Sequence, residues 1–167
     1  MSLDEHELPD HLRKRVVVLG VGNSLFGDDG FGPATVQFML RSMEVPGDVC
    51  VLDAGTAVMP ILLDILLSDV GPKRLIILDT ADLGKKPGEL VRMSVKQLPQ
   101  TRGNIFSFHT FSARMVLQEL ENRKCLEVII LACQAEEISP EIREGLSEPV
   151  NDAVSLAGQI VLEMASR

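Results

Sequence analysis

The chain has 167 residues, of which 46% are hydrophobic and 24% are charged, as is ordinary for one soluble globular domain. Its formal net charge of −8 argues against the phosphate backbone of a nucleic acid or an anionic membrane surface as a partner. The three cysteines, Cys50, Cys125 and Cys133, form no CxxC pair, which argues against a disulfide framework or a thiolate metal site.

The first 15 residues carry no secretory signal pattern, and no apolar run is long enough to span a bilayer. We therefore expect a cytoplasmic protein with no membrane partner. Residues 1–13 are polar and charged and predict a loose lead-in to one domain that covers residues 1–167.

Apolar runs then alternate with amphipathic patterns along the chain. Short runs rich in Val, Ile and Leu predict buried strands at residues 16–19, 49–52, 75–78 and 128–131. A less apolar segment at residues 89–93 predicts a short strand at an edge of the sheet. Helical periodicity predicts helices at residues 31–43, 58–67 and 110–122, and a last helix that Ser147 caps.

Alternating strands and helices of this kind indicate an α/β fold, in which helices cover both faces of a mostly parallel sheet. In such sheets, functional sites form at the carboxyl ends of the strands. Acidic residues follow three of the predicted strands: Asp28 and Asp29, then Asp53, then Asp79 and Asp82.

His109 lies directly before a predicted helix, and this places an imidazole at the same edge of the sheet. Carboxylates and an imidazole together indicate a site for a borderline divalent metal such as zinc, nickel or cobalt. Each residue also has a structural interpretation. Asp53 equally fits a turn, Asp82 fits a support for the turn to Gly84, and a histidine beside a helix start is often structural.

A nucleotide site is the main competing interpretation of the glycine-rich turn after the first strand. Gly20 and Gly22 match the first two glycines of GxGxxG, but Leu25 stands at the third position. Adjacent carboxylates at Asp28 and Asp29 also oppose the field that attracts phosphate to a helix N-terminus. The sequence therefore predicts a cation site and no nucleotide.

The turn itself, GVGNSLFGDDGFG at residues 20–32, resembles the signature of the nickel–iron hydrogenase maturation endopeptidases. The resemblance continues along nearly the whole chain after residue 15. Further matching motifs are DAGT at 53–56, LDTADLG at 78–84, PGE at 87–89, FHT at 108–110 and SEPV at 147–150.

This resemblance implies a phosphorylase/hydrolase-like fold, with a twisted five-stranded sheet between helices and one antiparallel strand. It implies an endopeptidase that removes the C-terminal extension of a hydrogenase large-subunit precursor after nickel insertion. It also implies metal ligands at Asp29, Asp79 and His109, with the nickel supplied largely by the precursor. The histidine segment and the acidic composition resemble the methanogen branch, which serves deazaflavin-reducing hydrogenases.

Two mechanisms are compatible with these residues. Either the metal polarises the scissile carbonyl and delivers hydroxide, or Asp29 or Asp79 acts as general base and nickel serves for recognition. Substrate-binding or supporting positions in the same motifs are Gly22, Asn23, Asp28, Gly30, Asp53, Thr56, Asp82 and Gln134. The chain departs from the family at residues 132–135, where ACQA replaces the frequent GIQP and keeps only Gln134.

Two other functions stay open. The same residues would serve a non-catalytic nickel-binding maturation chaperone, which holds the precursor without cutting it. A nucleotide-dependent oxidoreductase is disfavoured by the acidic pair that follows the first strand.

Overall fold

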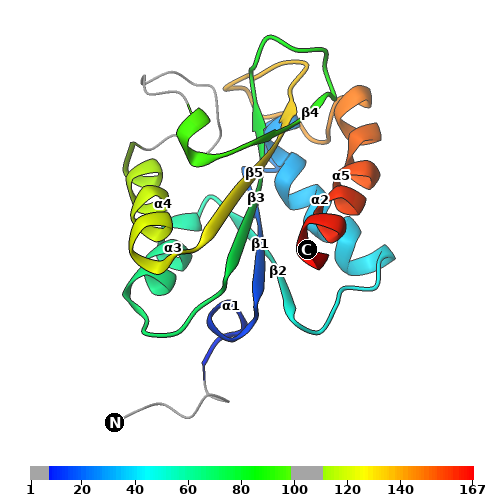
Figure 1. Cartoon of the computed structure of the whole chain (residues 1–167). Helices are drawn as coiled ribbons and strands as arrows, with labels where there is room; N and C mark the ends of the chain where they lie inside the picture. Colours follow the sequence, from blue (N-terminus) through cyan, green and yellow to red (C-terminus); the bar gives the residue numbers. More distant parts are fainter. Residues whose placement is uncertain (1–7, 99–110) are drawn as a thin grey trace.

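The computed structural model describes residues 8–98 and 111–167, which form a sheet between two layers of helices (Figure 1). The strands of this described part are β1 (Val16–Val21), β2 (Val49–Gly55), β3 (Arg74–Ala81), β4 (Leu90–Met93) and β5 (Glu127–Gln134). Their order in the sheet is β2-β1-β3-β5-β4, and only β4 is antiparallel to its neighbour. The predicted five-stranded, mostly parallel sheet with one antiparallel strand is confirmed.

Two pairs of helices cover the faces of the sheet. The helices are α1 (Asp10–Arg13), α2 (Phe31–Ser42), α3 (Val58–Leu67), α4 (Phe111–Lys124) and α5 (Glu148–Ser166), with 3₁₀ turns η1 (Gly27–Gly30) and η2 (Val95–Gln97). Helices α2 and α5 pack together on one face, and α3 and α4 pack together on the other (Figure 1). None of the described helices is both long and apolar enough to cross a membrane.

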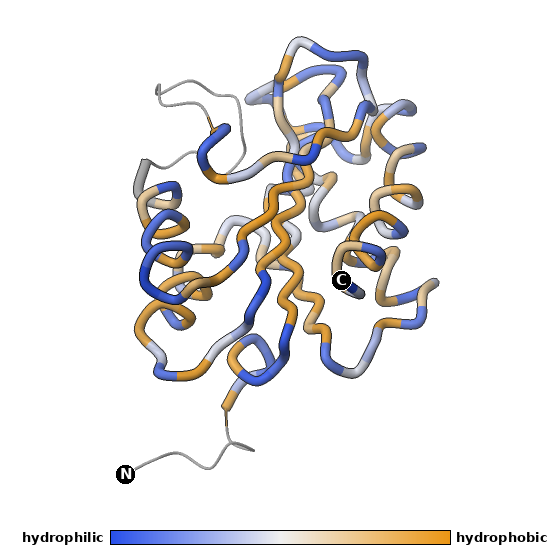
Figure 2. The backbone as a smooth tube through the Cα atoms, in the orientation of Figure 1, coloured by the Kyte–Doolittle hydropathy of each residue, from blue (hydrophilic) through white to orange (hydrophobic). Residues whose placement is uncertain are grey.

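The hydrophobic strands lie in the middle of the molecule (Figure 2). Along β1, alternate side chains enter opposite cores, because successive residues of a strand point to opposite faces. Val17 and Leu19 belong to the core under α3 and α4, whereas Val16 and Val18 belong to the core under α2 and α5. Burial of both faces explains why the strands are continuously apolar in sequence.

All four parallel strands extend further toward their carboxyl ends than the apolar runs predict. Strand β2 continues to Gly55 and β3 to Ala81, so Asp53 and Asp79 are strand residues rather than turn residues. The reason is backbone pairing: Gly20 pairs with Asp53 on β2, and Asp79 pairs with Ala132 on β5. Ladder hydrogen bonds therefore fix the backbone of both acidic residues.

Part of the segment predicted as a loose lead-in has regular structure. Residues 10–13 form helix α1, which packs beside α3, and Leu12 is buried in the core under α3 and α4. A single apolar residue in a polar stretch is too weak a signal to predict this contact.

Two glycines bring the start of α2 into contact with the sheet. A Cβ atom on Gly32 would lie 2.3 Å from the carbonyl oxygen of Val21 and 2.5 Å from that of Leu78. A Cβ atom on Gly20 would lie 2.5 Å from the carbonyl oxygen of Gly32. Gly32 thus gives the close helix–strand packing that the third glycine gives in dinucleotide-binding folds, and it holds η1 above the ends of β1 and β3.

Candidate active site

The strand order creates a crevice at the carboxyl end of β1. From β1 the chain crosses to β2 on one side and then to β3 on the other, so the loops after β1 and β3 diverge at this point. Ligands bind at such switch points in open α/β sheets. Asp29 follows β1 in η1, and Asp79 lies near the end of β3, so the fold brings both predicted carboxylates to this edge.

Asp29 is half-buried and its carboxylate is fixed by the turn that precedes it. The backbone N–H of Asn23 donates to Oδ2 of Asp29 at 2.8 Å, and Oδ1 of Asn23 accepts from the N–H of Leu25 at 3.0 Å. Gly22 has a φ of 131°, and its N–H donates to the carbonyl oxygen of Gly55 at 3.0 Å. Gly22 and Asn23 therefore support Asp29 through the backbone.

Asp79 is fully buried, in contrast to Asp29. The backbone N–H of Thr80 donates to its Oδ1 at 2.8 Å. A carboxylate in this position is shielded from bulk water, and interactions with charges are stronger there than at the surface. The two acids thus offer one carboxylate that solvent reaches and one that it does not.

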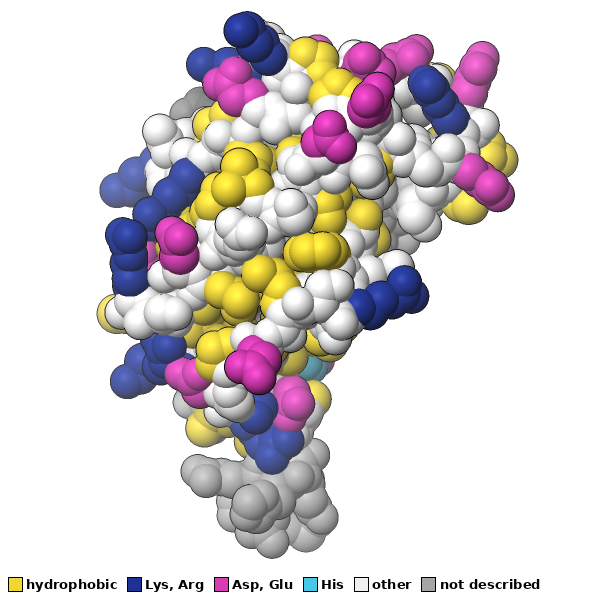
Figure 3. Space-filling model, turned by 90° about the vertical axis from the view of Figure 1, so that its right-hand side faces the viewer, with side chains coloured by type: hydrophobic (Ala, Val, Ile, Leu, Met, Phe, Trp, Pro, Cys, Tyr) yellow, Lys and Arg dark blue, Asp and Glu magenta, His cyan; other side chains and the backbone are white. Residues whose placement is uncertain are grey.

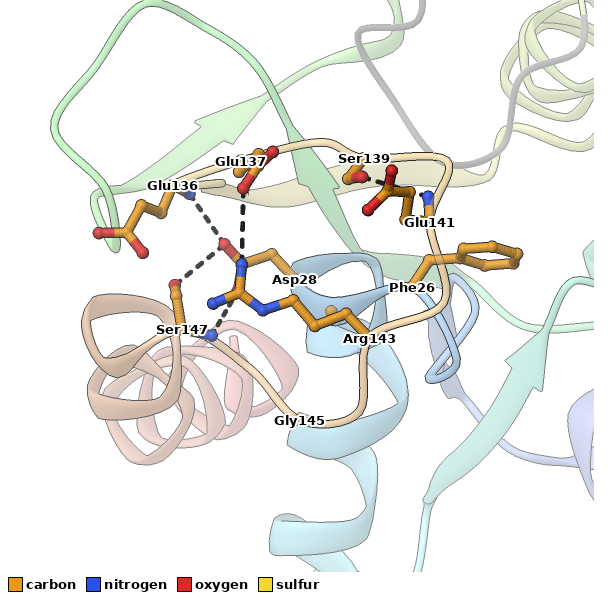
Figure 4. Close-up of a pocket in the computed structure, with 10 residues that line it drawn as sticks. Phe26, Asp28, Glu136, Glu137, Ser139, Glu141, Arg143, Gly145 and Ser147 are labelled. Atoms are coloured by element: carbon orange, nitrogen blue, oxygen red, sulfur yellow. Dashed lines mark hydrogen bonds and ion pairs between the residues drawn. The ribbon is translucent and has the colours of Figure 1, made fainter.

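Asp28 has a structural role that distinguishes it from Asp29. Its carboxylate is buried and accepts three hydrogen bonds, from the N–H of Glu136 at 2.9 Å, the N–H of Ser147 at 2.7 Å and Oγ of Ser147 at 2.9 Å (Figure 4). Its carbonyl oxygen accepts a hydrogen bond of 2.5 Å from Oγ1 of Thr80. Asp28 therefore ties three parts of the chain together: η1, the end of β3, and the segment between β5 and α5.

Ser147 occupies the N-cap position of α5, as predicted, but its side chain makes no capping hydrogen bond. Its hydroxyl donates to Asp28 instead. The prediction of a side-chain cap is therefore wrong: the hydroxyl is directed toward the buried carboxylate of Asp28 and not toward the N–H groups of the first turn of α5.

Gln134 is also a supporting residue. Its buried Oε1 accepts from the N–H groups of Leu83 at 2.7 Å and Lys85 at 3.1 Å. Its Nε2 donates to Oδ1 of Asp82 at 3.2 Å and to the carbonyl oxygen of Ala135 at 2.9 Å. Gln134 and Asp82 thus shape the loop after β3.

An open hollow lies at the turn after β1, lined by Gly22, Asn23, Ser24, Pro33, Asp53, Gly55 and Thr56. Its Asn23 is the residue whose N–H donates to Asp29. Asp53 is exposed there, and its Oδ1 accepts from the N–H of Gly55 at 3.0 Å, a local bond at the end of β2. Gly30 lets η1 approach the neighbouring turn, since a Cβ atom on it would lie 3.0 Å from Cα of Ser24.

The predicted third ligand, His109, lies outside the described residues. Within residues 8–98 and 111–167, no three His, Cys, Asp or Glu side chains are grouped so that they could hold a metal ion. The triad of Asp29, Asp79 and His109 therefore stays a prediction.

Two residues near the site were not predicted. Thr80 links β3 to η1, and Cys133 is a buried neighbour of Asp28. Burial raises the pKa of the Cys133 thiol to about 12, and the negative charge of Asp28 acts in the same direction. Thr80 could have been predicted as a supporting residue, because it directly follows an aspartate at the end of a strand.

Comparison with known proteins agrees with this arrangement. Residues 33–164 match the model of a family described as hydrogenase maturation protease. A Methanocaldococcus jannaschii protein classed by name with these proteases is 36% identical over 151 residues, which cover 90% of this chain and 96% of that protein. The coenzyme F420 hydrogenase subunit delta of Methanothermobacter thermautotrophicus is 31% identical, over 89% of this chain and 92% of that protein.

Among solved structures, the hydrogenase maturating endopeptidase HybD of Escherichia coli superposes with a TM-score of 0.72 and 28% identity, over 90% of this chain and 91% of that one. The predicted resemblance and the predicted peptidase activity are confirmed. The chain belongs to the hydrogenase maturation protease family, and it is an endopeptidase.

Proposed function

We propose that this endopeptidase removes the C-terminal extension of the large-subunit precursor of a nickel–iron hydrogenase, and that the nickel ion arrives in the precursor. The observation that carries this proposal is the position of Asp29 and Asp79. They lie at the carboxyl ends of neighbouring strands, and a backbone N–H group orients each carboxylate. Two oriented carboxylates at a switch point suit a cation that a protein substrate carries.

The roles of the two acids follow from their exposure. Asp29 is half-buried, so a water molecule that attacks the scissile carbonyl can donate its proton to this carboxylate. Asp79 is fully buried and suits a contact with the nickel ion rather than with bulk water. His109 is the third nickel contact in this proposal, and nickel accepts both carboxylate and imidazole ligands.

We propose a coenzyme F420-dependent hydrogenase as the partner, in the cytoplasm. The similarity to the delta subunit of such a hydrogenase supports the partner. All three cysteines are free thiols, and this fits a reducing compartment. Nucleic acid and nucleotide are excluded from the proposal because of the charge of −8 and the acidic turn.

The test is incubation of the chain with purified precursor, either loaded with nickel or free of it, followed by the mass of each product. We expect the nickel-loaded precursor alone to give a shortened large subunit and its C-terminal extension as one released peptide, the tail peptide. Equal cleavage of both precursors would refute the role of nickel but not the peptidase activity. A stable complex without shortening would instead support the non-catalytic chaperone and refute the proposal.

A further inference from the structure

The segment between β5 and α5 is long and irregular, and it borders the candidate site. Residues 135–147, which we call the β5–α5 arm, contain no helix or strand, and only Arg143 forms an isolated bridge, with Phe26. Side chains 140–145 are all exposed. Long connections without secondary structure are uncommon in compact domains, and many of them bind substrates.

The arm is nevertheless held firmly at three places. The carboxylate of Asp28 binds both of its ends, at Glu136 and at Ser147 (Figure 4). In the middle, the N–H of Gly27 donates to the carbonyl oxygen of Arg143 at 2.8 Å, and the N–H of Arg143 donates to that of Leu25 at 2.8 Å. An arm fixed in this way loses little conformational entropy when a partner binds it.

The arm and the turn before η1 each expose a large apolar side chain, at positions that the backbone bridge brings together. Because Phe26 and Arg143 pair in parallel, the residues before them, Leu25 and Ile142, are neighbours across the same bridge. Leu25 is 52% exposed and Ile142 is 74% exposed. Neighbouring exposed apolar residues on a rigid frame indicate a protein contact.

The charge around this pair is negative. The arm contains four exposed glutamates, Glu136, Glu137, Glu141 and Glu144, and its single basic residue, Arg143, lies 3.5 Å from the carboxylate of Glu137. Acidic side chains gather at the top of the view in Figure 3, toward the carboxyl ends of the strands. A partner that covers Leu25 and Ile142 therefore meets a negative field.

The position of Leu25 connects this surface to the reaction. Leu25 and Asp29 are four residues apart, and a chain of that length spans at most about 14 Å. A protein that presents a peptide bond to Asp29 therefore comes within about 14 Å of Leu25, which the fold around that bond can reach. We therefore treat the surface at Leu25 and the acidic residue Asp29 as parts of one substrate-binding region.

We propose that Leu25, Ile142 and the glutamates of the β5–α5 arm form the docking surface for the precursor, and that the precursor contacts it with an apolar segment flanked by Lys or Arg. This inference rests on the proposed function, since it takes the precursor as the occupant. The apolar pair supplies the contact area, and the glutamates select a basic partner.

The test compares two variants of the full chain on nickel-loaded precursor, with rates read from the mass signal of the tail peptide. The double variant Leu25→Ser/Ile142→Ser removes the apolar pair without a change in charge. Leu156→Ser is the matched control, because Leu156 is also 52% exposed but lies on α5, whose face with α2 shows a separate hydrophobic area (Figure 3). All three changed side chains are at the surface, and thermal unfolding verifies that both variants fold.

We expect the double variant to raise KM about tenfold with kcat within about twofold of wild type, and Leu156→Ser to leave both unchanged. Equal KM values for the double variant and the control would overturn the docking surface while wild-type cleavage still supported the proposed function. We further expect the KM of wild type to rise with salt from about 0.05 to about 0.5 M, and Glu141→Gln/Glu144→Gln to weaken that dependence. A salt-independent KM would refute the basic flank of the partner.

Discussion

Asp28 and Asp29 are adjacent in the chain, yet their carboxylates lie in different surroundings. They belong to the 3₁₀ turn η1, in which successive side chains point about 120° apart. Asp28 therefore points to the β5–α5 arm, while Asp29 points to the turn at Asn23. The doublet was predictable as a cation site from the sequence, but its division into a structural and a functional acid was not. The partner that distinguishes Asp28, Ser147, is 119 residues away, beyond any local pattern.

Asp28→Asn should destabilise the fold, because one carboxylate oxygen becomes an NH₂ group that faces N–H and O–H donors. We expect the free energy of unfolding to fall by about 3 kcal/mol, as measured by urea denaturation. Asp53→Asn is the control, since Asp53 is exposed and accepts one local bond, which an asparagine oxygen also accepts. Its stability should stay within about 0.5 kcal/mol of wild type. Equal effects of the two substitutions would contradict the structural role of Asp28.

At the scale of the elements, apolar runs predicted the existence and order of the strands but not where they end. Asp53 and Asp79 are polar, so a hydrophobic pattern ends before them, although the ladder continues through both. The packing of α2 against the sheet could not be predicted from the sequence either. Gly32 belongs to a glycine-rich motif, but its contact with Val21 and Leu78 depends on the crossing of a helix over two strands. Distances of this kind follow from the assembled fold and not from sequence spacing.

Gly32→Ala should be among the most damaging single changes, because the new methyl group would overlap the carbonyl oxygens of Val21 and Leu78. We expect a loss of about 3 kcal/mol or failure to fold, and lower activity in the folded fraction, since α2 and η1 must shift. Gly47→Ala is the matched control: no atom lies within 4 Å of its added Cβ, and its φ is not positive. The control should be neutral or stabilise by less than about 1 kcal/mol. A Gly32→Ala protein as stable as Gly47→Ala would contradict this account of the packing.

At the scale of the whole molecule, the strand order decides where the site lies. Strands β2 and β3 flank β1, so the acidic residues near the carboxyl ends of these strands lie at one edge of the sheet. This shared edge was predictable, because the carboxyl ends of parallel strands lie together. The two cores on either side of the sheet bury Cys50 and Cys133. Burial raises the pKa of Cys50 to about 11 and that of Cys133 to about 12.

The raised pKa values of these two thiols predict that the protein becomes less stable at alkaline pH. Their pKa is raised in the folded state, so the unfolded chain releases these protons first, from a pH of about 9 upward. The free energy of unfolding therefore falls as the pH rises, by about 2 kcal/mol for each thiol between pH values of about 8 and 10.5. Urea denaturation at both pH values measures this fall, and Cys50→Ala/Cys133→Ala should reduce it. An unchanged fall in the double variant would show that other groups cause it.

In the proposed reaction, Asp29 acts on a peptide bond of the nickel-loaded precursor. The most direct measurement is the rate of precursor shortening, read by mass, for wild type, Asp29→Asn and Asp53→Asn. The two substitutions are chemically identical. Asp53 lines the hollow, and Asp29 accepts a hydrogen bond from Asn23, which lines the same hollow. We expect Asp29→Asn to slow cleavage at least about 100-fold, while Asp53→Asn stays within about threefold of wild type. Undiminished cleavage by Asp29→Asn would contradict the account.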